Sequence, residues 1–117
     1  MSVFNQQKKI CRKFGLSYEP CDMDKYLYIS KNFKEKTEEM DIEGKRYIEE
    51  DDFSGWYIWA GEKTNDIESF DKILVSDINE YSDLIMKFLW LERGTGFIIE
   101  KDYINAEFDY RIFNMID

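Results

Sequence analysis

The sequence predicts a single α+β domain spanning residues 1–117, with a mainly antiparallel sheet of about five strands and two packed helices. Three observations predict this fold. The chain has 117 residues, an ordinary size for one domain. Hydrophobic residues make up 44% of it and aromatic residues 17%, which is enough for one core. Segments with helical spacing of apolar residues alternate with segments patterned like strands.

The first two elements are a helix and a strand. Residues 2–14 are predicted to form an amphipathic helix, because apolar side chains recur at helical spacing and Gly15 follows as a stop. The apolar positions are Val3, Phe4, Ile10, Cys11 and Phe14. After a connector over residues 18–21, the segment 25–31 is rich in strand formers and predicts a strand.

The middle of the chain holds the weakest and the strongest strand signals. Residues 32–54 are polar and acidic and predict a long loop, in which only Tyr47 and Ile48 suggest a short strand. Residues 55–61 predict a strand with Trp56 on one side and Tyr57 and Trp59 on the other. Aromatic side chains on both sides are typical of a covered central strand, or of a strand whose second face meets a partner.

The last third predicts a strand, a helix and two more strands. Residues 71–75 read as a strand, and residues 77–89 as a helix that begins with a capping box of Asp77 and Glu80. A glycine turn over residues 93–96 leads into a strand over 96–100. Residues 106–112 alternate between apolar and charged side chains, which predicts a half-buried strand.

The composition narrows the possible chemistry. The chain has no histidine, which removes the commonest general base and the commonest zinc ligand. Cys11 and Cys21 are interpreted as reduced thiols, although a bridge between them is possible. The N-terminus shows no apolar signal-peptide region, and no segment approaches the roughly 20 apolar residues of a membrane-spanning helix. We therefore expect a cytoplasmic protein with no membrane contact.

The net charge of −9 lies in one region. Residues 35–71 contain 13 acidic and four basic side chains, whereas the rest of the chain has 12 of each sign. Such a region repels nucleic acid and favours a basic partner, or it serves only to keep a small domain soluble. Four basic residues on the first predicted helix are too few, beside this acidity, to predict nucleic-acid binding.

Catalytic and metal-binding motifs are not evident. The consecutive acids Glu49, Glu50, Asp51 and Asp52 lack the spacing of a calcium loop, and neither cysteine has a histidine to activate it. The glycine turn over residues 94–96 follows a helix and precedes a strand, the reverse of a phosphate-binding loop. We therefore predict no catalytic residue, no metal and no cofactor.

Several segments resemble one bacterial family. The strongest is the run Ser54-Gly55-Trp56-Tyr57-Ile58-Trp59-Ala60-Gly61-Glu62, and the segments 12–20, 73–75, 77–91, 96–99 and 106–109 follow in a similar order. This pattern is similar to that of immunity-protein family thirty-three, formerly a domain of unknown function. The resemblance implies a non-catalytic protein of polymorphic toxin systems that neutralises a cognate toxin.

The resemblance implies a cognate protein toxin as the partner. A basic nuclease would suit the acidic middle of this chain, because the active cleft of a nuclease must attract phosphate. The predicted contact residues combine the acidic middle with the aromatic strand: Glu49, Glu50, Asp51, Asp52, Trp56, Tyr57, Trp59, Glu62 and Asp66. Two other hypotheses stay open. One is a small-molecule or peptide-binding module with a pocket beside Tyr57 and Trp59. The other is an enzyme that uses a carboxylate pair. The sequence does not give the oligomeric state.

Overall fold

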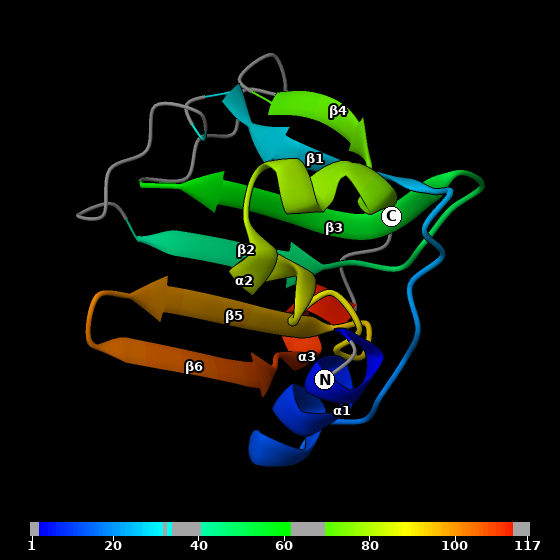
Figure 1. Cartoon of the computed structure of the whole chain (residues 1–117). Helices are drawn as coiled ribbons and strands as arrows, with labels where there is room; N and C mark the ends of the chain where they lie inside the picture. Colours follow the sequence, from blue (N-terminus) through cyan, green and yellow to red (C-terminus); the bar gives the residue numbers. More distant parts are fainter. Residues whose placement is uncertain (1–2, 32, 34–40, 62–69, 114–117) are drawn as a thin grey trace.

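The computed structural model describes residues 3–31, 33, 41–61 and 70–113 (Figure 1). In chain order the elements are α1 (Val3–Lys13), β1 (Tyr26–Ser30), β2 (Ile42–Arg46), β3 (Phe53–Ala60), β4 (Phe70–Leu74), the 3-10 helix η3 (Val75–Glu80), α2 (Asp83–Met86), β5 (Thr95–Glu100), β6 (Tyr103–Phe108) and α3 (Tyr110–Phe113). None of the helices in these ranges has the length and apolarity of a membrane-spanning helix.

The α+β class is confirmed, and the sheet is larger than the sequence predicts. It has six strands in the order β4-β1-β3-β2-β5-β6. Strands β1 and β3 run parallel, and the other four neighbouring pairs are antiparallel. The sheet is therefore mixed, and the described residues form four helical segments instead of two.

The long loop predicted over residues 32–54 is wrong in its second half, because β2 lies there. This strand pairs with β3 on one side and with β5 on the other, so it is a central strand. Its core-facing positions are Ile42, Gly44 and Arg46, a set that does not look like a strand in sequence. Gly44 is required because a side chain there would collide with the ring of Phe97.

The helix predicted over residues 77–89 is also wrong. The segment instead forms η3 and then the short helix α2. Ser82 interrupts it with an extended backbone, at φ −168° and ψ 121°. The Ser82 hydroxyl accepts a hydrogen bond from Ile85 N–H and caps α2. Asp77 lies in the first turn of η3, whose cap residue, Leu74, makes no side-chain cap hydrogen bond.

The remaining predicted elements match within a few residues, except at the C-terminal end. The predicted helix over 2–14 corresponds to α1, and the strands predicted over 25–31, 55–61, 71–75 and 96–100 correspond to β1, β3, β4 and β5. The strand predicted over 106–112 begins earlier, as β6, and ends at Phe108. Asp109 N–H donates to Gly94 C=O, and the chain then turns into α3.

One face of the sheet carries the core. Figure 1 shows η3 and α2 in front of the central strands, and their buried Ile78 and Ile85 join one cluster with Trp56 and Ile58 of β3. Helix α1 is attached to this layer by a hydrogen bond from Gln7 Nε2 to Met86 C=O, at 2.9 Å. The other face of the sheet is contacted by α3, whose Ile112 side chain lies against Gly96 of β5.

Both cysteines lie in this core. Cys11 and Cys21 are buried and free, so the interpretation as thiols rather than a disulfide is confirmed. Burial raises the pKa of both thiols, which keeps them protonated and unreactive at neutral pH.

Candidate functional site

Six half-buried rings cluster on the sheet face opposite the core. We call this cluster the aromatic face; it consists of Tyr26, Tyr28, Tyr47, Phe53, Tyr57 and Phe70. Alternation along each strand places it there, since Leu27 and Ile29 of β1 and Trp56 and Ile58 of β3 point into the core. The rings come from β1, β3, β4 and the residue after β2, so four separate segments of the chain build one surface.

Tyr57 is the centre of the aromatic face. Its ring centroid lies 5.1 Å from that of Tyr28, 5.5 Å from those of Tyr47 and Phe53, and 5.8 Å from that of Phe70. Edge-to-face and stacked pairs at these distances stabilise one another beyond the area that they bury. The rings therefore hold a defined arrangement while part of each stays accessible.

The aromatic face is uncharged but already attracts one cation. Burial raises the pKa of Tyr26, Tyr47 and Tyr57, so these phenols stay protonated at neutral pH. The Lys72 ammonium lies 3.9 Å from the centroid of the Tyr26 ring, a cation–π contact. A surface with this chemistry suits apolar side chains and the cationic heads of Lys or Arg.

An acidic turn adjoins one end of the aromatic face. We use this name for Glu50, Asp51 and Asp52, whose side chains are exposed. Backbone hydrogen bonds in both directions between Glu50 and Phe53 close the turn, and Asp51 takes a positive φ of 44° that Asp tolerates. Tyr26 N–H donates to Asp52 C=O at 2.8 Å, which fixes the turn beside the Tyr26–Phe53 ring pair.

Glu49 differs from the three acids that follow it, because it is bound within the protein. Its carboxylate accepts from Lys25 Nζ at 2.9 Å and from Arg93 Nη2 at 3.3 Å. Arg93 also donates from Nε to Glu19 at 2.8 Å. The hydrogen bond from Lys25 is the main cause that lowers the pKa of Glu49 below its usual value.

Glu49→Gln is expected to remove an acid-sensitive part of the stability. A carboxyl with a lowered pKa in the folded state stabilises the fold above its usual pKa of 4.5, and this contribution is lost as the pH falls through the lower folded value. Because the group is partly exposed, we expect less than about 1 kcal/mol at neutral pH. Urea unfolding at several pH values would show the difference between the two proteins shrinking below pH 5. A difference independent of pH would contradict the assignment.

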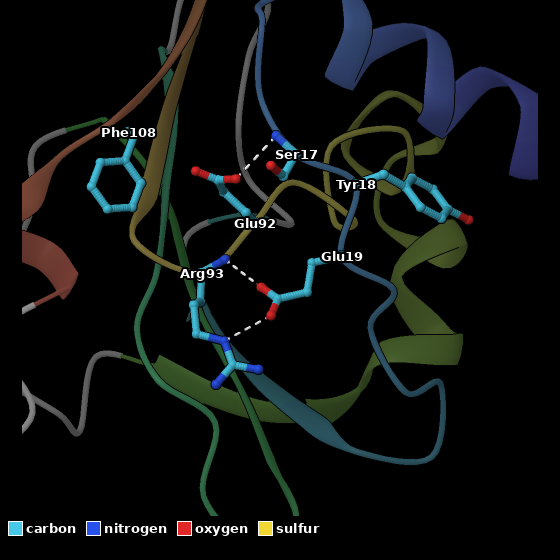
Figure 2. Close-up of a pocket in the computed structure, with 6 residues that line it drawn as sticks. All are labelled: Ser17, Tyr18, Glu19, Glu92, Arg93 and Phe108. Atoms are coloured by element: carbon cyan, nitrogen blue, oxygen red, sulfur yellow. Dashed lines mark hydrogen bonds and ion pairs between the residues drawn. The ribbon is translucent and has the colours of Figure 1, made fainter.

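A cavity of about 380 Å³ lies near this ion-pair network. Figure 2 shows the residues that line it, which are Ser17, Tyr18, Glu19, Glu92, Arg93 and Phe108. Its carboxylates bind protein groups: Glu19 accepts from the backbone N–H and Nε of Arg93, and Glu92 accepts from Ser17 N–H at 3.0 Å. A second cavity, of about 170 Å³, lies between β2, β5, β6 and α3. Neither cavity is lined by Tyr57 or Trp59, the residues of the hypothetical ligand pocket.

The structure separates the predicted site residues into three groups. Tyr57 and the acids of the acidic turn come together at one surface, with Glu49 next to them. Trp56 and Trp59 are buried, and their indole nitrogens donate to Leu89 C=O and to the Glu43 carboxylate, so neither offers surface to a partner. Glu62 and Asp66 lie outside the described residues.

Five rings of the aromatic face were not predicted as site residues. The strand of Tyr26 and Tyr28 could be found in sequence, because residues 25–31 show a strand pattern, whereas Tyr47 and Phe53 fall in the predicted loop and Phe70 precedes the strand predicted over 71–75. Their meeting depends on the parallel pairing of β1 with β3 and on the position of β4 beside β1, which no local pattern reveals. Within the described residues, no group of three or more potential metal ligands occurs.

The comparisons with known proteins found one family. The sequence model of the Imm33-like domain matches residues 6–109, which confirms the resemblance stated from the sequence. No curated protein and no solved structure matches the chain.

Proposed function

The chain belongs to the Imm33-like domain family, and from this membership we propose that it is an immunity protein that neutralises a cognate toxin. In this proposal it acts in the cytoplasm, by direct protein–protein binding and without catalysis. The family name supports the immunity function, and the surface described above supports direct binding.

We assign toxin binding to this surface on one observation. The acidic turn lies directly beside the aromatic face. Tyr and Trp are enriched among the residues that contribute most to protein interfaces, because rigid rings bury a large area at little entropic cost. Three neighbouring carboxylates accelerate the encounter with a basic protein and align it. We propose that the toxin presents a basic surface here, which a nuclease would need for its own substrate.

The first experiment is co-expression with the toxin gene expected next to this one. Cell survival and co-purification are both scored. Rescue together with a stable complex would support immunity by binding. Rescue without any complex would overturn direct binding and favour action on the toxin's target or product. A neighbouring protein that is not toxic would remove the basis for choosing it as the partner.

The triple variant Glu50→Lys, Asp51→Lys, Asp52→Lys is expected to weaken toxin binding at least about tenfold, mostly through slower association. The three acids are exposed in a closed turn, so the main expected cost to the fold is about 1–2 kcal/mol for Lys at the positive φ of residue 51. Association rates at several salt concentrations would test this, because removal of steering charges flattens the salt dependence.

The matched control reverses Asp77, Glu80 and Asp102, three exposed acids on η3 and on the β5–β6 turn. It changes the net charge equally but leaves the acidic turn intact. Equal loss of binding in both triple variants would show that net charge, rather than this surface, attracts the toxin. The aromatic face is tested by measuring toxin binding of Tyr28→Ala, which should be weaker than that of the unchanged protein. The control is Leu84→Ala, which removes a side chain 36% exposed on α2 and should leave toxin binding unchanged.

A further inference from the structure

A cation already lies on the aromatic face of the free protein. Lys72 belongs to the edge strand β4 and pairs with Tyr28 of the neighbouring strand β1 (Figure 1). Its ammonium lies 3.9 Å from the centroid of the Tyr26 ring, well inside the distance of about 6 Å at which a cation is attracted to an aromatic ring. The Tyr26 ring therefore marks a place where this surface binds positive charge.

Lys72 is held in this place only weakly. Its side chain is exposed, and within the described part of the chain it forms no ion pair. Lys25, in contrast, is fixed by the Glu49 carboxylate at 2.9 Å. A cation–π contact at an exposed site is a weak interaction, so another cation can replace Lys72 at small cost.

The Tyr26 ring is held in position by its neighbours and not by Lys72. It stacks with the Phe53 ring at a centroid distance of 5.4 Å and meets the Tyr28 ring edge-on at 5.5 Å. Both Tyr26 and Phe53 are half-buried. The ring therefore keeps its orientation when Lys72 leaves, and a site that needs no rearrangement binds its ligand at a lower entropic cost.

The acidic turn supplies carboxylates beside this ring. Tyr26 N–H donates to Asp52 C=O at 2.8 Å, and the side chains of Asp51 and Asp52 are exposed. Burial is the main cause that raises the pKa of Tyr26, and the charge of the Asp52 carboxylate adds to it, so this carboxylate lies within electrostatic range of the ring. An aromatic ring next to a carboxylate suits a guanidinium group, which is planar, stacks on rings and donates two parallel hydrogen bonds to a carboxylate.

We propose that Tyr26 and the acidic turn bind an arginine side chain of the toxin, which takes the position that Lys72 occupies in the free protein. The guanidinium stacks on the Tyr26 ring and donates to a carboxylate of the acidic turn, while Lys72 moves into solvent. This inference rests on the proposed immunity function and names the side chain by which the toxin is recognised. Lys72 is then an internal competitor of the toxin.

Removal of this competitor should strengthen the complex. Lys72→Met is expected to tighten toxin binding between about two- and thirtyfold, because the arginine no longer has to displace a cation from the ring. Lys72→Arg restores a cation that can stack there, so it should bind the toxin more weakly than Lys72→Met does. The matched control is Lys101→Met, which removes an exposed cation from the β5–β6 turn and changes the net charge equally. Equal tightening by the two Met variants would contradict the competition at Tyr26.

Substitution of the ring tests its contribution directly. Tyr26→Leu keeps an apolar side chain but removes the π-system, and it should weaken toxin binding by a similar factor. Tyr26→Phe retains the ring and should bind more tightly than Tyr26→Leu. Urea unfolding of both variants shows whether a difference in binding reflects a difference in folding. Equal toxin binding by the two folded variants would overturn the role of the ring.

Nuclear magnetic resonance with a tetraarginine peptide tests the site without the toxin. Protons above an aromatic ring resonate upfield, so the Lys72 methylene next to the ammonium should be shifted upfield in the free protein. Tetraarginine should return this signal toward its ordinary value, and tetralysine, a peptide of equal charge, should do so less. An unchanged Lys72 signal would overturn the cation site, and equal effects of the two peptides would overturn the preference for arginine.

The same signal separates this inference from the proposed function. Its return toward the ordinary value in the toxin complex would support the exchange of Lys72 for a toxin side chain. A toxin that binds while the Lys72 signal stays upfield would overturn the exchange and leave immunity by direct binding intact. Displacement of Lys72 by tetraarginine, in a chain that does not bind its neighbouring toxin, would support the cation site and count against the proposed function.

Discussion

Replacing Arg46 with Met is expected to lower the free energy of unfolding by about 3 kcal/mol or more, although Met fills a similar volume. Arg46 extends from the end of the central strand β2 and is buried. Its Nη1 donates to Glu19 C=O at 2.8 Å and to Leu91 C=O at 2.7 Å. One side chain therefore joins β2 to the connector after α1 and to the segment before β5.

Three costs add up in this variant. The two carbonyl groups lose their charged donor in a place that water reaches poorly, and Glu19 loses a cation 3.9 Å away. Glu19 keeps Arg93 as its partner, so the loss of this pair is the smallest of the three. The guanidinium is buried, and this burial lowers the pKa of Arg46 below its usual value.

Urea unfolding would measure the effect, with Lys45→Met as the matched control. Lys45 is the neighbouring cation on β2, and it is half-buried on the opposite face of the strand. We expect this control to cost less than about 1 kcal/mol, because Lys45 lies at the surface of the sheet and not in the core. If both variants lost the same stability, the charge of β2 would matter and the hydrogen bonds of Arg46 would not.

Gly55→Ala is expected to cost about 3–4 kcal/mol, a large effect for the addition of one methyl group. Gly55 has a φ of +98°, and a Cβ there would collide with the carbonyl oxygen of Tyr47. The two segments cannot move apart easily, because Tyr47 N–H donates to Gly55 C=O at 2.8 Å. The added methyl group therefore meets backbone atoms instead of a side chain that could rotate away.

Gly15→Ala provides the control for conformation alone. Gly15 also has a positive φ, of +67°, but a Cβ there would meet nothing within 4 Å. It should cost only the left-handed backbone penalty of about 1–2 kcal/mol. Thermal unfolding of the two variants separates two contributions to the loss of stability. One is the collision of the new Cβ with the Tyr47 carbonyl oxygen, and the other is the positive φ of a residue that is not glycine. Equal costs would contradict the collision at Tyr47.

Local patterns in the sequence were enough to predict the helix and the strands whose apolar residues recur at regular helix or strand spacing. They predicted α1 and the strands β1, β3, β4 and β5, and they placed Trp56 and Tyr57 on opposite sides of β3. They missed β2 because two of its three core positions are not apolar. The absence of a side chain at Gly44 leaves room for the Phe97 ring, and the Arg46 guanidinium donates hydrogen bonds to backbone carbonyl groups. Both reasons depend on residues more than 25 positions away, so no local window contains them.

Local patterns also failed to reveal which distant residues meet at the candidate site. The acidic run was visible as charge, and the structure separates Glu49, which binds Lys25 and Arg93, from the three exposed acids after it. Trp56 and Trp59 were reasonable anchors by composition, but both find hydrogen-bond acceptors within the fold. The sequence could supply the chemistry of the surface, and only the pairing of β1 with β3 and β4 could supply its members.

The position of β2 between β3 and β5 also sets an order of events during synthesis. Strand β2 meets β3 soon after both leave the ribosome, but its other edge waits for β5, where Ile42 pairs with Ile99. Arg46 likewise reaches its acceptor on Leu91 only late. Such distant pairings make folding slow and leave a central strand open in the nascent chain. If the chain is an immunity protein, protection would therefore begin only after β5 has been synthesised and has paired with β2.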